Sequence, residues 1–201
     1  MNPCHFSDAR RGFLKKTASL AALYLTPSIL VNAVAAETII PAPIPKEKLH
    51  LSINGKVFDL EIDARTTLLN LLREQIGYTG TKKGCEMGQC GACTIHINGK
   101  RTKSCMQLAL NHQNNQITTI EGLSKGDDLH PMQKAFLKHD AFQCGYCTSG
   151  QIMSAVACVR EGQTKNRDMI KSYMDTNICR CGAYQNIVDA IEEVAKSETK
   201  I

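Results

Sequence analysis

The spacing of hydrophobic residues along the chain changes near residue 124. Between residues 46 and 124, apolar residues alternate with polar ones, which is the period of a half-buried strand. From residue 125 onward they recur every three or four positions, as they do on one face of a helix. This change predicts an α+β chain with a small sheet first and helices after it.

The first half predicts two hairpins, a helix and a final strand. Asn54-Gly55 and Asn98-Gly99 are hairpin turn signals, each between alternating runs. Thr66 or Thr67 can cap a helix that ends by Gly77. The expected strands cover residues 49–54, 58–63, 94–97, 100–103 and 116–120. Hairpin, helix, cysteine loop and hairpin is the element order of a β-grasp ferredoxin.

The second half predicts four short amphipathic helices, which would pack as a compact bundle. Pro131 is a favoured first residue of a helix, and Asn166 is a helix start. The other two helices are expected at residues 150–161 and around residues 187–194. The side expected to face the core in the first helix is Met132, Ala135, Phe136 and Leu137.

One loop carries most of the chemistry of the first half. Its cysteines follow the spacing C-x4-C-x2-C with a fourth further on, which is typical of a plant-type [2Fe-2S] cluster. The predicted ligands are Cys85, Cys90, Cys93 and Cys105. Gly84, Gly88 and Gly91 allow close backbone approach and positive φ around inorganic sulfide. Zinc or a disulfide knot is the alternative, but zinc sites usually use paired C-x2-4-C units.

A second set combines C-x2-C with C-x-C, just before the second and fourth predicted helices. Its members are Cys144, Cys147, Cys179 and Cys181. Helix N-termini direct free amides toward anionic sulfur. Alone, this set fits zinc or an iron–sulfur cluster. The first cysteine loop on the same chain favours a second [2Fe-2S] cluster, because two in series can carry electrons. Cys4 and Cys158 are left over, and Cys158 is expected to be a buried hydrophobe.

The first 36 residues read as a targeting segment. Arg10-Arg11 followed by Gly12-Phe13-Leu14-Lys15 resembles the signal of the twin-arginine export route. An apolar run over residues 18–36 ends in small residues that suit cleavage. A membrane anchor is the alternative, although Pro27 interrupts the run. We therefore expect a signal peptide over 1–36, a Pro-rich linker over 37–47 and a folded periplasmic protein.

Charge and composition argue against nucleic-acid binding. The net charge is +5, but the segment before residue 37 contributes three of these charges, so the basic pI is no sign of nucleic-acid binding. Tryptophan is absent, which argues against a base-stacking surface. Residues Lys82, Lys83, Lys100, Arg101 and Lys103 flank the first loop, as a solvated face or as a docking patch for an acidic partner.

The chain shows no catalytic constellation. Its six histidines are neither paired nor next to the cysteine pairs, so each is expected to be structural or exposed. No Ser/His/Asp set, P-loop or G-x-G-x-x-G occurs, so FAD or NAD would bind another chain.

Three segments carry a family resemblance. Residues 80–94, 142–150 and 177–184 resemble the cluster-binding segments of the molybdenum hydroxylases, which include xanthine dehydrogenase and aldehyde oxidoreductase. The resemblance covers residues 48–196. It implies a β-grasp ferredoxin domain over 48–124 and a helical [2Fe-2S] domain over 125–201. With the export signal, the chain is most similar to iron–sulfur subunits of periplasmic aldehyde oxidoreductases.

The resemblance also implies a division of labour between subunits. A large partner would bind molybdenum cofactor and oxidise the substrate. Aldehydes, which would give carboxylic acids, are the expected substrates, and N-heterocycles are the alternative. Electrons would pass through the Cys144 set and then the Cys85 set, to a flavin (FAD) subunit or a cytochrome. Gln143 and Cys181 match family residues that lie against the cofactor's pterin. Outside the family, the rival hypotheses are a free-standing ferredoxin and a zinc-stabilised interaction module.

Two departures from the family pattern stand out. Residues 86–89, Glu-Met-Gly-Gln, place bulk and charge between the first two cysteines, which is expected to affect the first cluster's potential or its redox partner. Ser149 replaces a common proline, and serine also suits a helix start.

Overall fold

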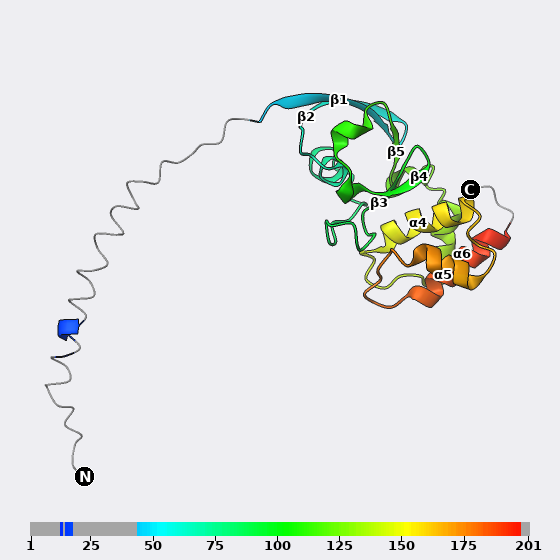
Figure 1. The fold of residues 1–201 in the computed structure, drawn as a ribbon. Coiled ribbons are helices and arrows are strands. Elements are labelled where there is room, and N and C mark those ends of the chain that lie inside the picture. The colour runs from blue at the N-terminus through cyan, green and yellow to red at the C-terminus, as the bar shows by residue number, and fades with distance from the viewer. Residues whose placement is uncertain (1–12, 14, 18–43, 198–201) are drawn as a thin grey trace, which may run out of the picture. The chain divides into compact units, whose positions relative to one another are not determined.

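The computed structural model describes residue 13 and residues 15–17 and 44–197 (Figure 1). The chain forms two units, Met1–Pro43 and Ile44–Ile201. In the first unit the described residues are helical, and Arg10, Arg11 and the predicted cleavage site lie outside the described residues. Within the described part of the chain, no helix combines the length and hydrophobicity needed to cross a membrane.

Five strands form one mixed sheet in the second unit. They are β1 (Lys46–Ile53), β2 (Lys56–Asp63), β3 (Thr94–Ile97), β4 (Lys100–Lys103) and β5 (Gln116–Thr118). Their order across the sheet is β2-β1-β5-β3-β4, in which β1 and β5 are parallel and the other neighbours antiparallel (Figure 1). Both predicted hairpins are confirmed. Asn54 and Gly55 turn the first with φ of 52° and 78°, which only glycine and a few polar residues adopt readily.

A short helix lies between the hairpins in sequence and supplies leucines to the core of the sheet. Helix α2 (Leu68–Asn70) continues as a π-helical turn over Leu71–Gln75. Thr67 caps it, because its Oγ1 accepts a hydrogen bond from the Asn70 amide at 3.2 Å. The buried leucines of this segment are Leu68, Leu69, Leu71 and Leu72.

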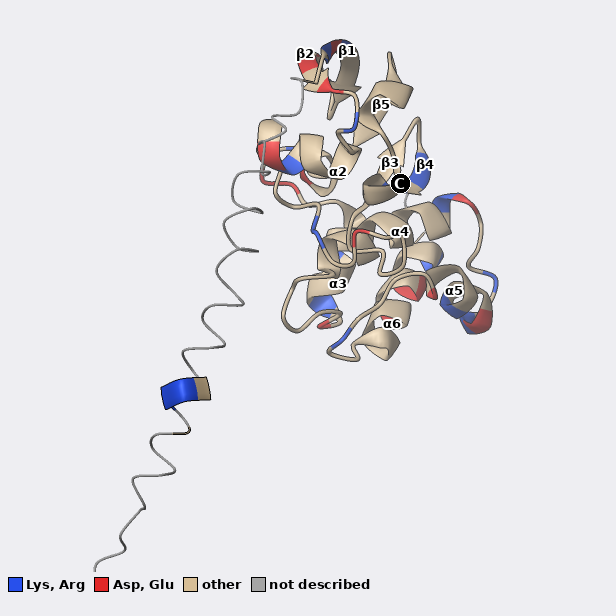
Figure 2. Ribbon diagram, turned by 60° about the vertical axis from the view of Figure 1, so that its left-hand side comes forward, with Lys and Arg blue, Asp and Glu red and all other residues tan. Residues whose placement is uncertain are grey.

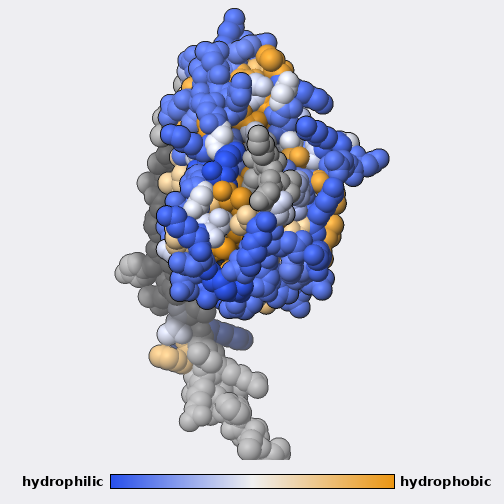
Figure 3. Space-filling view, turned by 90° about the vertical axis from the view of Figure 1, so that its right-hand side faces the viewer, coloured by the Kyte–Doolittle hydropathy of each residue, from blue (hydrophilic) through white to orange (hydrophobic). Residues whose placement is uncertain are grey.

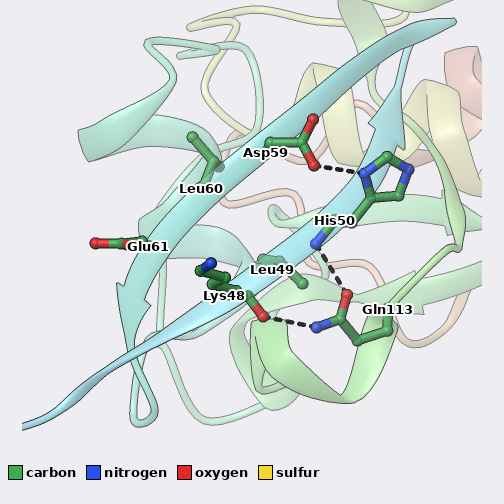
Figure 4. Close-up of a pocket in the computed structure, with 7 residues that line it drawn as sticks. All are labelled: Lys48, Leu49, His50, Asp59, Leu60, Glu61 and Gln113. Carbon is green, nitrogen blue, oxygen red and sulfur yellow. Dashed lines mark hydrogen bonds and ion pairs between the residues drawn. The ribbon is translucent and has the colours of Figure 1, made fainter.

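The open half of β1 is completed by a side chain. Strand β5 pairs only with Ser52 and Ile53 at the end of β1. Gln113 takes the place of a neighbouring strand: its Nε2 donates to Lys48 O at 2.7 Å, and its Oε1 accepts from the His50 amide at 2.8 Å (Figure 4). These residues line a surface pocket of about 470 Å³. Gln113 therefore satisfies backbone groups that would otherwise face solvent.

Four α-helices follow the sheet in the described part of the second unit, after the 3-10 turns Ser104–Met106, Ala109–His112 and Ile120–Gly122. They are α3 (Pro131–Lys138), α4 (Thr148–Arg160), α5 (Arg167–Met174) and α6 (Tyr184–Lys196). Met132, Ala135 and Phe136 are buried as expected. Leu137 is instead 54% exposed, so its predicted core position was wrong. Because a helix turns 100° per residue, Leu137 points away from the face that Met132 and Phe136 share.

The sheet and the helices pack directly against each other. Helix α4 lies along β3 (Figure 1), and the buried His96 ring reaches Met153 O of α4 with its Nε2 at 2.8 Å. Arg101 of β4 donates from Nη1 to Tyr173 O at 2.8 Å, and its guanidinium lies 3.5 Å from the centre of the Tyr173 ring. The molecular face shown in Figure 3 is mostly hydrophilic, with small separate hydrophobic patches.

Two candidate iron–sulfur centres

The structure brings the first four predicted ligands together as two pairs. Cys85 and Cys90 contact each other, and each sulfur accepts the other residue's amide at 3.3–3.4 Å. The Cys105 thiol contacts Cys93 and is close enough to Cys85 for an electrostatic interaction between the two sulfurs. Residues within 20 positions of one another thus form one sulfur cluster, because Cys105 lies in the 3-10 turn Ser104–Met106 that follows β4.

Backbone amides surround the Cys85 sulfur. It accepts hydrogen bonds from Met87, Gln89 and Cys90 at 3.5, 3.2 and 3.3 Å. Burial acts to raise the pKa of Cys85, but these amides lower it to about 7. By contrast, burial, followed by the adjacent Cys93 thiol, raises the pKa of Cys105 to about 11. The loop therefore offers a ring of donors for anionic sulfur at one end of the site.

Gly84 makes room for this loop. A Cβ at Gly84 would lie 2.5 Å from Cys90 Sγ, which is closer than real Cβ contacts come. The close approach that the sequence predicted for this glycine is thus present in the structure.

The second set also forms two pairs. Cys144 contacts Cys181, and Cys147 contacts Cys179. The Tyr146 amide, followed by Cys181, lowers the pKa of Cys144. Burial, followed by Cys179, raises the pKa of Cys147 to about 12, so the position of Cys147 at the start of α4 does not outweigh its desolvation.

The two sets suit a binuclear cluster. None of the nine cysteines that the structure describes forms a disulfide. Among the same described residues, no three or more His, Cys, Asp or Glu side chains are grouped so that together they could hold a metal ion. A [2Fe-2S] cluster takes four cysteine thiolates, two at each iron. Two contacting pairs in each set match that demand.

The two cysteine loops are joined by hydrogen bonds. The Ile178 amide, directly before Cys179, donates to Cys90 O at 3.0 Å. Asn177 Nδ2 donates to Gly91 O and to the α4 residue Gly150 O, both at 3.2 Å. A Cβ at Gly150 would overlap Gly91 O, so only glycine lets α4 start this close to the first loop. A single hydrogen bond thus joins Cys90, a candidate ligand of the first set, to Ile178, the residue before the candidate ligand Cys179 of the second set.

Part of the second set lies at the surface. Cys144 and Cys181 are exposed, and so is Gln143. Large apolar side chains are exposed in the same segments, namely Phe142, Tyr146, Ile178 and Tyr184. This region therefore combines two candidate ligands with apolar surface that is exposed to solvent.

Three structural contacts were not predicted from the sequence. Lys103 Nζ donates to Gly88 O at 2.6 Å, Asn177 links the two loops, and Tyr146 Oη donates to Lys83 O. Most cations expected on a solvated face also have partners: Lys82 Nζ donates to Thr79 O and Lys83 pairs with Glu74. The position of Lys103, two residues before Cys105, was the one sequence signal for its contact.

Two family models match the chain. A [2Fe-2S] binding domain covers residues 119–192, and a 2Fe-2S iron-sulfur cluster binding domain covers residues 51–118. Together they support one cluster in each half of the second unit.

Known proteins match over nearly the whole folded part. The aldehyde oxidoreductase iron-sulfur-binding subunit PaoA of Escherichia coli O157:H7 is 49% identical over 96% of this chain and 90% of its own length. The alpha subunit of isoquinoline 1-oxidoreductase from Brevundimonas diminuta is 43% identical over 74% of this chain and 97% of its own. The crystal structure of quinoline 2-oxidoreductase from Pseudomonas putida 86 matches with a TM-score of 0.72 and 41% identity, over 75% of this chain and 93% of that one. The chain belongs to the family of two-cluster iron–sulfur subunits of the molybdenum hydroxylases.

Proposed function

We propose that this chain is the electron-transfer subunit of a molybdenum hydroxylase complex. When bound, each [2Fe-2S] cluster supplies a centre that takes up and releases one electron. The single observation that carries the proposal is the hydrogen bond from the Ile178 amide to Cys90 O, at 3.0 Å. It holds the loop of the second set against the loop of the first, so the chain keeps both centres close and fixed.

The exposed face of the second set is the proposed contact with the large subunit. Cys144 and Cys181 need cover from solvent, and the exposed Phe142 and Tyr146 supply apolar area for a partner. Gln143 and Cys181 are the residues proposed to lie against the molybdenum cofactor that the partner binds. The partner would oxidise the substrate, and this chain would contribute no catalytic residue.

Aldehydes are the proposed substrate class, because PaoA, at 49% identity, carries that name. The isoquinoline and quinoline enzymes make N-heterocycles the second candidate. The substrate pocket would belong to the partner, so the choice depends on residues of that chain.

Electrons would leave from the first set. Met87 and Met106 are exposed, and Met106 packs against Gly88 of the cysteine loop. We assign this apolar surface to an electron-accepting partner, either an FAD subunit or a cytochrome.

The complex is proposed to work in the periplasm. The Arg10-Arg11 motif supports twin-arginine export of a protein that already holds its clusters. Replacing both arginines by lysine should keep the full-length chain in the cytoplasm, as cell fractionation would reveal. Unchanged export of the double variant would exclude this route.

Cys147→Ser in the assembled complex tests the direction of electron flow. We expect the first centre to keep its EPR signal, because its ligands are untouched, while reduction by substrate stops. Dithionite should still reduce the first centre, which controls for its integrity. Reduction by substrate at the unmodified rate would contradict the proposed order of the two centres.

A further inference from the structure

Lys103 is the last residue of β4, a strand that carries Lys and Arg (blue in Figure 2). Its side chain is half-buried and turns back toward the first cysteine loop. Its Nζ donates a hydrogen bond of 2.6 Å to Gly88 O, which lies between Cys85 and Cys90. This is a short, charge-assisted contact.

The peptide group that Lys103 contacts also faces a candidate ligand. Gly88 C=O and the Gln89 N–H belong to the same peptide unit. Its oxygen accepts from the ammonium, and its N–H donates to Cys85 Sγ at 3.2 Å. One planar peptide group therefore connects the positive charge to the sulfur.

This arrangement has an electrostatic consequence. A cation at the carbonyl oxygen draws electron density toward that end of the peptide, so the N–H at the other end becomes a stronger donor. Stronger hydrogen bonds to cluster sulfur favour the state with more negative charge, which is the reduced one. The positive charge of Lys103 acts in the same direction.

The neighbouring cations do not share this connection. Lys83 pairs with Glu74 at 2.9 Å, and Arg101 contacts Tyr173. Lys100 is exposed on the same strand as Lys103. It offers a matched control, because its removal changes the net charge by the same amount.

We propose that Lys103 is a positioning residue that raises the reduction potential of the first centre through the Gly88–Gln89 peptide and the Cys85 sulfur. The proposal rests on the proposed function, in which Cys85 is a ligand of that centre. It explains why a lysine in this half of the chain points inward to a loop carbonyl instead of into water.

The test is an EPR-monitored redox titration of the complex, in which the two centres are followed by their separate signals. For Lys103→Met we expect the equilibrium constant for reducing the first centre to fall about tenfold, or ~59 mV for one electron. Lys103→Arg, which keeps the charge and donors, should stay near the unmodified value. Lys100→Met should move neither centre, and the second centre should be unchanged in all variants.

Each result decides the proposal. Equal potentials in Lys103→Met and Lys100→Met would overturn it, and so would a fall in Lys103→Arg as large as in Lys103→Met. If the Lys103→Met variant does not assemble the first centre, the potential of Lys103→Gln is measured instead. An unshifted potential of the first centre in Lys103→Gln would overturn the proposal. Fewer than two signals in the unmodified complex would instead contradict the proposed function itself.

Discussion

The His96 ring donates from Nε2 to Met153 O at 2.8 Å and thereby ties the sheet to helix α4. A carbonyl oxygen can only accept, so this nitrogen carries the proton. His96 is 2% exposed, and burial lowers its pKa from the ordinary value of 6.5. Burial therefore favours the neutral form of the histidine at this contact between the two halves of the second unit.

This burial makes stability fall with acidification. The unfolded chain binds a proton at His96 near pH 6.5, whereas the folded chain binds it only at lower pH. The stabilising contribution is thus complete above about pH 6.5 and is lost as the pH falls below it. Thermal unfolding should show a weaker pH dependence in His96→Gln than in the unmodified protein. His50→Gln, at an exposed position, is the control, and an equal pH dependence in all three would contradict the expectation.

Asn177→Ala should destabilise the fold, because it would leave buried hydrogen-bonding groups without a partner. Its amide group serves Gly91 O and Gly150 O, and its Oδ1 accepts from Ser154 Oγ at 2.8 Å. Leaving such groups unpaired costs about 1–3 kcal/mol. Urea unfolding measures the change. Asn186→Ala removes a hydrogen bond from an exposed asparagine and should cost less than about 0.5 kcal/mol, so similar losses in the two variants would count against a special role for Asn177.

Gly84→Ala should prevent assembly of the first centre alone. The added methyl group would meet Cys90 Sγ, and the loop would have to move the sulfur away from its partners. We expect the EPR signal of the first centre to disappear or broaden while that of the second stays. The second centre serves as the internal control, and two unchanged signals would show that the loop tolerates the methyl group.

Cys158→Ala should leave both centres intact. Cys158 is fully buried, its Sγ faces Gln163 O at 3.4 Å, and burial raises the pKa of its thiol to about 12. A thiol in such surroundings is inert. The iron content per chain should equal that of the unmodified protein. A loss of iron would mean that the cysteine ligands of the two centres are assigned incorrectly.

The local elements of this fold could be read from the sequence, because they follow from local periodicity. Strands β3 and β4 match the predicted ranges, since alternating residues and the Asn98-Gly99 turn fix a hairpin by themselves. Leu137 was misplaced because its hydrophobicity was taken as a sign of burial, whereas the helix geometry turns it outward.

Long-range polar contacts could not be predicted in the same way. The Asn177 amide meets Gly91 across 86 positions, and no pattern within a sequence window marks that pairing. Lys103 was expected on a solvated face or in a docking patch, because charge alone does not reveal which carbonyl a lysine will reach. The cysteine spacing was informative because the ligands of one cluster lie close together in sequence on short loops.

The most direct test of this account is the iron and acid-labile sulfide content of the purified, intact protein. Two [2Fe-2S] clusters require about four iron and about four sulfide per chain. That result, with negligible zinc, is the one we expect. About two iron and two sulfide, or zinc in place of iron, would contradict a chain that conducts electrons through two centres.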